Sequence, residues 1–316
     1  MRILRLGAGA VALAAAGFGW SLLEARWYTL RRFTVPVLPP GSAPLRVLHV
    51  SDIHLVPSQH AKRAWVASLA DLQPDLVVST GDTLADQHAV PAAVEAHLGL
   101  LERPGVFVLG SNDYYAPRRK NPLGYFKPQR GKKRIIGRRL PTRDLVGAFS
   151  SAGWLNLTNT RGTLEIAGQR LEFAGVDDPH LKRDRYPERQ VRPSGPPPTL
   201  RIGVTHAPYL RVLDTMAADG ADLILAGHTH GGQLCLPLAG ALVTNCDLDR
   251  RRAKGLHRHQ GAWMHVSAGL GTSPYTPVRF ACRPEASLLT LVARADDGGE
   301  REPVGDTGFV SGRMLG

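Results

Sequence analysis

The chain has 316 residues, of which 43% are hydrophobic and 6% aromatic, and its formal net charge is +12. This length allows one large or two ordinary domains with a mostly aliphatic core, and the charge favours anionic partners: phosphate esters, nucleic acid or an acidic membrane surface. The three cysteines, Cys235, Cys246 and Cys282, lack a C-x-x-C spacing, which argues against a disulfide framework and against a cysteine-based zinc site.

An apolar stretch at the N-terminus points to contact with a membrane. Residues 6–23 carry no charge, and a helix of that length spans about 27 Å, barely the hydrocarbon thickness of a bilayer. We favour a single membrane anchor. The alternatives are a signal peptide, with a small-residue cleavage site at Ala14-Ala15-Ala16, and a buried Ala-rich helix. Residues 1–40 are therefore predicted to be an anchor or signal segment with its connector. We expect the protein to be membrane-associated, on a side that the flanking charges leave open.

The main domain, residues 41–295, is predicted to alternate between strands and helices. Short Val-, Ile- and Leu-rich runs predict buried strands, and the apolar periodicity between them predicts helices. The first third then has a β-α-β-α-β order, which is typical of a parallel sheet. The predicted strands are 45–50, 76–79, 106–109, 201–205, 223–226, 263–266 and 286–292, the helices are 61–72, 90–101 and 143–152, and a hairpin turns at 167–169. The Gly-rich, polar residues 296–316 are expected to form a disordered tail.

Five of the predicted strands end in residues that can bind metal ions. The segments are Asp52-Ile53-His54, Gly81-Asp82, Gly110-Ser111-Asn112-Asp113, Thr205-His206 and Gly227-His228-Thr229-His230. Open α/β sheets build their sites beyond the carboxyl ends of strands, so these segments predict one site assembled from distant parts of the chain. Singly they are weak signals, because an Asp after Gly is usually a turn residue. Two histidines that flank one residue after a buried strand are a stronger signal.

The set contains carboxylates, an amide and imidazoles, and no thiolate. Such ligands suit Mn²⁺, Fe or Zn²⁺ and argue against Cu(I) or an iron–sulfur cluster. Seven ligands are too many for one tetrahedral ion, but two ions that share a carboxylate would use them all. Ions about 3.5–4 Å apart can hold a bridging hydroxide and clamp a phosphoryl group during in-line displacement. The residues therefore predict two divalent metal ions and a phosphoester substrate.

The order D-x-H, G-D, G-N-H-[DE], H and G-H-x-H resembles that of the calcineurin-like metallophosphoesterases. The run Gly231-Gly232-Gln233 is similar to the membrane-associated bacterial branch of that family, and the resemblance covers residues 44–294. It implies a four-layer α/β/β/α sandwich of two mixed sheets with helices outside, here preceded by an N-terminal apolar helix. It also implies the metal ligands: Asp52, His54 and His230 on the first ion, Asn112, His206 and His228 on the second, and Asp82 as a bridge.

The third motif departs from the family pattern. The family has G-N-H-[DE], in which Asn binds metal and His assists the leaving group, whereas this chain has Gly110-Ser111-Asn112-Asp113. A gapless match puts Ser111 at the metal position, and a shift of one residue puts Asn112 there and Asp113 near the leaving group. We favour Asn112 as the ligand, because an amide oxygen coordinates better than a neutral hydroxyl. The catalytic candidates are therefore Asn112, Asp113 and His206.

In either match the usual histidine acid is missing. Loss of a general acid typically costs about 10²–10⁴-fold, but less for leaving groups that need no proton, such as aryl phosphates or a phosphate within a pyrophosphate. We expect protonation by water, by Asp113 or by another residue such as His180. For the segment Asp177-Asp178-Pro179-His180 an Asx turn is the favoured interpretation, ahead of a role in the site.

Residues 114–143 form a basic insertion directly after the third motif. They hold eleven Lys and Arg residues and no acid. We favour a flap that binds an anionic substrate or lipid headgroups, and Arg118, Arg119 and His180 are the substrate-binding candidates. The alternative is a solvated, mobile loop. Nucleic acid ranks lower, because the aromatic residues of the insertion are clustered rather than spread along it.

The sequence thus predicts a metal-dependent phosphodiesterase or pyrophosphatase at a membrane, acting on lipid-linked phosphoesters. The runner-up substrate is a nucleotide-sugar lipid pyrophosphate. A different class of function is a scaffold on the same fold that has lost catalysis. Such a scaffold should have lost several ligands, whereas here only the third motif is altered. The metal identity, the physiological substrate and the oligomeric state stay open.

Overall fold

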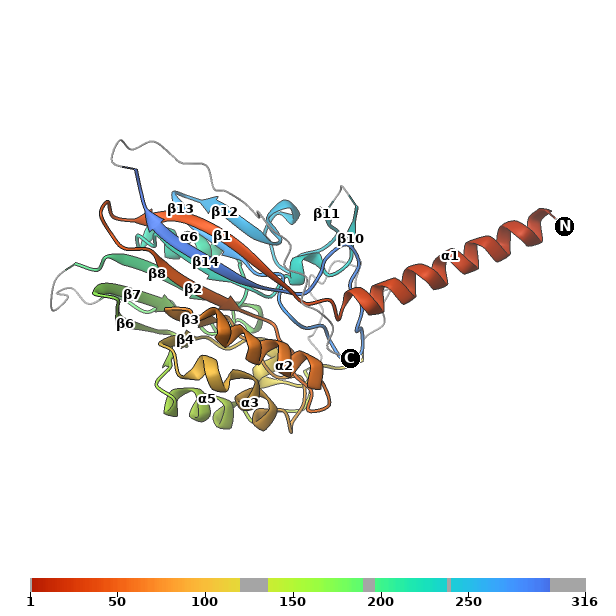
Figure 1. Ribbon diagram of the computed structural model, residues 1–316, viewed down its shortest axis with the longest axis horizontal. Coiled ribbons are helices and arrows are strands. Elements are labelled where there is room, and N and C mark those ends of the chain that lie inside the picture. Colours follow the sequence, from red (N-terminus) through yellow and green to blue (C-terminus); the bar gives the residue numbers. More distant parts are fainter. Residues whose placement is uncertain (1, 120–135, 190–196, 238–239, 296–316) are drawn as a thin grey trace.

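Two six-stranded sheets packed face to face form the centre of the molecule (Figure 1). The computed structural model describes residues 2–119, 136–189, 197–237 and 240–295, with side chains from residue 12 onward. The first sheet has the order β1 (Thr29–Leu38), β14 (Glu285–Ala293), β2 (Leu45–Val50), β3 (Leu76–Ser79), β4 (Gly105–Phe107) and β5 (Leu155–Asn156). The second has the order β12 (Gly255–His259), β13 (Ala262–Val266), β9 (Leu223–Ala226), β8 (Leu200–Thr205), β7 (Gln169–Gly175) and β6 (Thr160–Ile166).

Both sheets are mixed, with a parallel centre. Strands β2, β3, β4 and β5 run parallel, while β14 is antiparallel to β2 and parallel to β1. In the second sheet β13, β9, β8 and β7 run parallel, and the outer strands β12 and β6 are antiparallel to their neighbours. The five strands predicted to carry ligands therefore all lie in parallel parts, three in the first sheet and two in the second.

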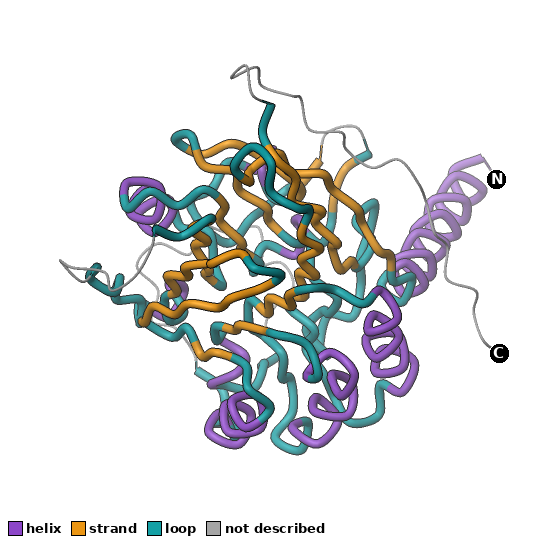
Figure 2. The backbone as a smooth tube through the Cα atoms, turned by 60° about the vertical axis from the view of Figure 1, so that its left-hand side comes forward, coloured by secondary structure: helices purple, strands orange, loops and turns teal. Residues whose placement is uncertain are grey.

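The alternation of side chains along the strands explains the layers. One face of each sheet meets the other sheet: Val47 and Val78 pack with Val204 and Leu225 in a common core. The opposite face of the first sheet packs under helices α2 (His60–Ser68), α3 (Val90–Leu101) and α5 (Thr142–Ser151). Helix α6 (Leu210–Ala218) covers the second sheet through Val212, Leu213 and Met216. Figure 2 shows these helices outside the strands, as a four-layer α/β/β/α arrangement requires.

The predicted strands, the three predicted helices and the hairpin are confirmed. The hairpin turns through Ala167 and Gly168, both with positive φ, which matches the twist of the flanking strands. Helix α6 and strand β12 were not predicted, and neither was the small pair β10 (Cys235–Leu236) and β11 (Gly240–Ala241). The N-terminal segment 1–40, predicted to be an anchor or signal segment with its connector, contains the whole of β1, which pairs with β14 at the edge of the first sheet.

The N-terminal helix α1 (Arg2–Glu24) extends away from the sheets (Figure 1). Within the described part of the chain, we find no helix with the length and apolarity needed to span a bilayer. The side chains of residues 1–11, which belong to the predicted anchor, lie outside the described part. So do the middle of the basic insertion, residues 120–135, and the predicted tail, residues 296–316.

Candidate metal centre

The predicted ligands lie in loops that follow five strands from both sheets. Asp52 and His54 follow β2, Asp82 follows β3, and Asn112 is the second residue of the short helix α4 (Ser111–Tyr114) after β4. His206 follows β8 directly, and His228 and His230 follow β9. Because these strands are parallel and the sheets are stacked, their carboxyl ends meet at one end of the sandwich.

Five of these residues have a left-handed backbone, which fixes the direction of each side chain. The φ angles are 49° at Asp52, 48° at His54, 53° at Asp82, 71° at His228 and 50° at His230. Such conformations cost about 1–3 kcal/mol for a residue other than glycine and cluster at functional sites. In these tight turns both ligands of one segment, such as Asp52 and His54, point into the site.

The first ligand group consists of Asp52, His54 and His230. The Nε2 atoms of His54 and His230 are 3.2 Å apart, and Asp52 Oδ1 lies 3.6 Å from His230 Nε2 and 4.0 Å from His54 Nε2. Asp52 Oδ1 is buried and has no hydrogen-bond partner. Since a buried carboxylate oxygen without a partner is costly, its place among imidazole nitrogens fits a bound cation.

The second ligand group consists of Asp82, His206 and His228. His206 Nε2 lies 3.6 Å from Asp82 Oδ1 and 3.3 Å from His228 Nδ1. The other oxygen of Asp82, Oδ2, lies 3.5 Å from His54 Nε2, in the first ligand group. The two oxygens of Asp82 thus face different groups, which suits a bridging carboxylate. Ligand atoms of Asp52, Asp82 and His206 also lie within 4.8 Å of one another.

The two groups differ in the protons that they hold without metal. Burial, followed by the charge of Arg279, lowers the pKa of His230 to about 3, and burial together with His230 lowers the pKa of His54 well below its usual range. Burial also lowers the pKa of His206, but the charges of Asp82 and Asp52 outweigh it and raise this pKa to about 9. A cation can therefore bind neutral imidazoles in the first group, but it must displace a proton from His206 in the second.

Backbone carbonyl groups and one hydroxyl group orient the ligand side chains through hydrogen bonds. His206 Nδ1 lies 2.8 Å from the carbonyl oxygen of Thr80, and His230 Nδ1 lies 3.1 Å from that of Gly271. The hydroxyl of Ser51 donates a hydrogen bond of 2.5 Å to Asp52 Oδ2. Partners of this kind fix the imidazole tautomer that can bind metal. Sequence reasoning could not name them, because a carbonyl oxygen is present in every residue.

In the third motif, Asn112 and not Ser111 lies at the ligands. The amide of Asn112 donates a 2.6 Å hydrogen bond to Asp82 Oδ2, and its backbone N–H donates one of 2.6 Å to Asp82 Oδ1. The hydroxyl of Ser111 instead donates to the carboxylate of Asp178. A side chain at Gly110 would lie 2.3 Å from Asp82 Oδ1 and 2.7 Å from His206 Cε1, which explains why the motif begins with glycine. These contacts place Asn112, rather than Ser111, beside Asp82, while its role as a ligand stays a prediction.

Asp113 is bonded to the backbone rather than exposed in the site. It is completely buried, and its carboxylate accepts hydrogen bonds from the N–H groups of Gly110, Asp82, Thr83 and Leu84. These bonds tie the third motif to the loop that carries Asp82. This geometry argues against the sequence-based expectation that Asp113 protonates the leaving group, and it gives the residue a positioning role.

His180 lies at the edge of the second ligand group. Its ring centroid is 4.4 Å from that of His228, and its Nδ1 lies 2.9 Å from the hydroxyl of Tyr209. Asp178 accepts the backbone N–H of His180 at 2.8 Å, which is the expected Asx-turn contact, and the same carboxylate reaches Ser111. The segment therefore forms a turn and also borders the site.

Arg118 and Arg119, the other substrate-binding candidates, lie at the described start of the basic insertion and are exposed. Arg118 bonds the carbonyl of Ile136 at 3.4 Å, and the guanidinium of Arg119 lies 5.7 Å from the ring centroid of Tyr275. The first contact joins the two described ends of the insertion to each other, and the second joins its start to the loop that contains Tyr275; neither of them joins an arginine to the ligand groups.

Comparison with known proteins identifies relatives of this chain. A family model described as calcineurin-like phosphoesterase matches residues 45–232, which is more than half of the chain and includes all seven ligand candidates. The chain is 27% identical over 298 residues to phosphodiesterase YaeI of Escherichia coli (strain K12), covering 92% of this chain and 98% of that protein.

Two other relatives carry similar names. The chain is 26% identical over 296 residues to an uncharacterized metallophosphoesterase, YkuE, of Bacillus subtilis (strain 168), covering 90% of this chain and 93% of that protein. It is 28% identical over 283 residues to a transmembrane protein with metallophosphoesterase domain of Bos taurus, covering 82% of this chain and 56% of that protein.

Proposed function

Because this chain belongs to the calcineurin-like phosphoesterase family, we propose that it hydrolyses phosphodiester or pyrophosphate bonds with two divalent ions held at the candidate metal centre. Membership makes it a hydrolase of phosphoric esters. The observation that carries the dinuclear proposal is the placement of Asp82, whose two oxygens face His54 and His206 at 3.5 Å and 3.6 Å.

Each ligand group would hold one ion, of Mn, Fe or Zn. Asp52, His54 and His230 would hold the first, Asn112, His206 and His228 the second, and Asp82 would be shared. When bound, such ions supply an activated water nucleophile and neutralise charge on the phosphate. The protein contributes the buried position of these side chains, which excludes bulk water and strengthens every charge interaction in the site.

Esters with good leaving groups are the favoured substrates, because the third motif lacks the usual histidine. Asn112 occupies the space beside Asp82, and an amide cannot deliver a proton to a leaving oxygen. His180, whose ring lies beside that of His228, would donate a hydrogen bond to the substrate instead. The Escherichia coli relative is named a phosphodiesterase, which favours diesters over monoesters. A nucleotide-sugar lipid pyrophosphate, whose leaving group is itself a phosphate, fits the same requirement.

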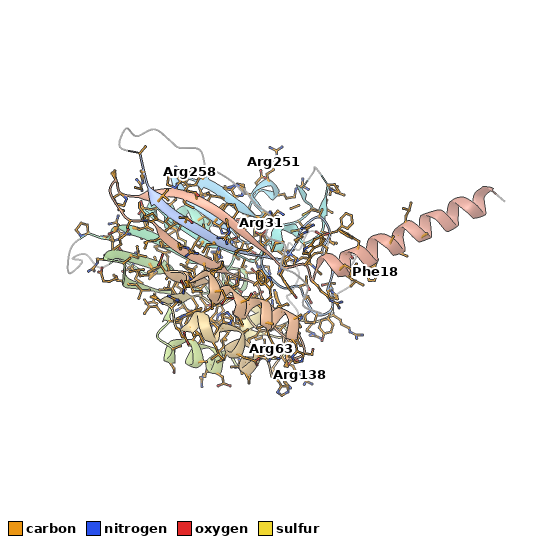
Figure 3. All side chains as sticks on the ribbon, viewed as in Figure 1. Phe18, Arg31, Arg63, Arg138, Arg251 and Arg258 are labelled. Atoms are coloured by element: carbon orange, nitrogen blue, oxygen red, sulfur yellow. The ribbon has the colours of Figure 1, made fainter. Side chains whose placement is uncertain are left out.

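Contact with a membrane through α1 completes the proposal. On this helix Leu13 is 76% exposed and Phe18 and Leu23 are each 61% exposed, and Phe18 lies close to the point where α1 leaves the domain (Figure 3). Several large exposed apolar residues on one helix suit a lipid interface. The net charge of +12 favours anionic lipids, and lipid-linked phosphoesters would then be at hand.

Hydrolysis of bis(4-nitrophenyl) phosphate in the presence of Mn²⁺, with metal content measured on the same sample, tests the enzyme proposal. We expect two ions per chain and turnover that is lost in Asp82→Asn. Asp86→Asn is the matched control, since Asp86 lies in the same loop and its carboxylate accepts the N–H of His88. Protein that binds no metal and hydrolyses no ester would overturn the proposal and favour a scaffold.

Co-sedimentation with lipid vesicles tests the membrane proposal separately. The full chain should bind anionic vesicles more strongly than neutral ones, and the double variant Phe18→Ser/Leu23→Ser should bind both weakly. Equal binding of wild type and variant would show that α1 does not contact the lipid.

A further inference from the structure

Arg279 is the largest side chain in the described part of the protein that is completely buried. Placing a guanidinium charge in the interior costs several kcal/mol unless hydrogen bonds satisfy it. An apolar residue would fill the same space at less cost. The position of Arg279 directly behind the first ligand group therefore calls for a physical explanation.

The guanidinium joins three backbone segments through carbonyl oxygens. Its Nη2 donates to Ala268, Gly269 and Gly271 at 2.8, 3.0 and 2.7 Å. Its Nη1 donates to the carbonyls of His230 at 3.3 Å and Cys282 at 3.5 Å. The planar, rigid arrangement of donors in arginine fixes these segments relative to one another, which a lysine ammonium would do less well.

One of these segments contains a metal ligand, and another packs against a second ligand. His230 is itself a ligand, and its Nδ1 lies 3.4 Å from Arg279 Nη2 and 3.1 Å from the Gly271 carbonyl that Arg279 also holds. The loop 268–271 packs on Asp52: the N–H of Gly271 donates to the Asp52 carbonyl at 2.5 Å. Arg279 thus sets the relative placement of His230 and Asp52, the two ligands whose atoms lie 3.6 Å apart.

The third segment, residues 279–282, is fastened to the end of helix α1. The N–H of Arg279 donates to the carbonyl of Ser21 at 2.9 Å. The buried carboxylate of Glu24 accepts the N–H groups of Ala281 at 3.0 Å and Cys282 at 2.6 Å. The end of the N-terminal helix is therefore linked to the first ligand group through one short stretch of chain.

We propose that Arg279 is a positioning residue for the first ligand group, and that Glu24 holds Arg279 in place, so that α1 sets the metal affinity of the site. The inference rests on the dinuclear centre proposed above. An N-terminal helix that shifts when it meets another surface would then alter the geometry around His230. Helix α1, which we propose to contact the membrane, would then also support the metal centre.

Measurement of Mn²⁺ binding by isothermal titration calorimetry tests this inference without a substrate. Loss of a group that orients a metal ligand typically lowers metal affinity about 10–100-fold. We therefore expect Arg279→Lys and Glu24→Gln each to lower the affinity for the first Mn²⁺ ion by about tenfold or more. Arg161→Lys is the control, because Arg161 bonds Glu172 and Asp219 on the outer part of the second sheet.

The melting temperature of each metal-free variant shows whether it is folded before titration. Wild-type affinity in both Arg279→Lys and Glu24→Gln would overturn the inference. Weaker binding in Arg279→Lys alone would overturn the part assigned to α1. Wild-type protein that binds no Mn²⁺ would instead refute the dinuclear centre, so the two failures are distinguishable.

Discussion

The close packing of Gly269 on Asp52 gives the sharpest test of the metal centre. Gly269 has a φ of +68°, and a Cβ at this position would lie 2.5 Å from the Cβ of Asp52 and 3.2 Å from its Cγ. Carbon atoms in ordinary contact are about 3.5–4.0 Å apart. In Gly269→Ala, Asp52 or the loop 268–271 must therefore move by about 1 Å.

The hydrogen bonds around the loop decide which of them moves. The N–H groups of Leu270 and Gly271 are bonded to the carbonyls of Ser51 and Asp52, and Arg279 holds the carbonyls of the loop from the other side. The displacement should therefore fall mainly on Asp52, whose Cβ can move only together with its backbone and carries the carboxylate with it. A ligand misplaced by about 1 Å can cost about 10²-fold in turnover. The left-handed backbone adds a loss of about 1–2 kcal/mol in the free energy of unfolding.

A matched glycine separates these two effects. Gly261 has a φ of +88°, and a Cβ added there would meet no atom within 4 Å. Gly261→Ala should lose about the same free energy of unfolding in urea denaturation and keep its turnover of bis(4-nitrophenyl) phosphate and its Mn²⁺ affinity. If Gly269→Ala kept its turnover within a factor of three of Gly261→Ala, the argument that Gly269 makes room for the ligand would be refuted.

Three further outcomes follow from the site. The pKa of His206 is raised to about 9, and its proton must leave before metal binds. Mn²⁺ affinity should therefore rise with pH from 6 to 9, by at most about tenfold per pH unit for one proton, and level off above pH 9. Calorimetry across this pH range checks the prediction, and a flat profile would contradict it. Removal of metal with EDTA should lower the melting temperature in a thermal-shift assay, since a ligand at a hundred times its Kd stabilises the fold by about 2.7 kcal/mol. An unchanged melting temperature would mean that the ligand groups hold no ion. The double variant Ser111→Asn/Asn112→His restores the order G-N-H-D and keeps an amide available to the metal. It should raise the turnover of alkyl phosphodiesters relative to aryl ones by tenfold or more, because a general acid contributes about 10²–10⁴-fold; an unchanged ratio would mean that no acid is missing.

The ligand positions were predictable because two patterns coincide in the sequence. Runs such as Leu76–Ser79 are buried at every position and consist mostly of Val, Ile and Leu, as is typical of strands covered on both faces, and each is followed by a short turn with a carboxylate or imidazole. Parallel strands then bring these turns together without any information about the rest of the fold. The sequence pattern does not show that the runs divide between two sheets, since each run has the same composition in either sheet; that division came from the family resemblance.

The role of Asp113 was not predictable from the motif. A pattern of residue types cannot distinguish a carboxylate that faces the site from one that accepts backbone N–H groups, and Asp113 does the latter. Arg279 escaped prediction for a related reason. It lies in a loop without periodicity, and its partners are carbonyl oxygens, which leave no trace in the sequence.

The outer position of β1 has a consequence for handling the protein in the laboratory. A shortened chain beginning at residue 41, where the sequence places the start of the main domain, would lack β1 and the buried Val35, Val37 and Leu38. The edge of β14 would then expose a row of unpaired backbone groups along an apolar strand, which invites pairing with other chains. Aggregation of such a fragment would reflect an opened sheet and would say nothing about the metal centre. A recombinant fragment that omits most of α1 should therefore begin ahead of Thr29.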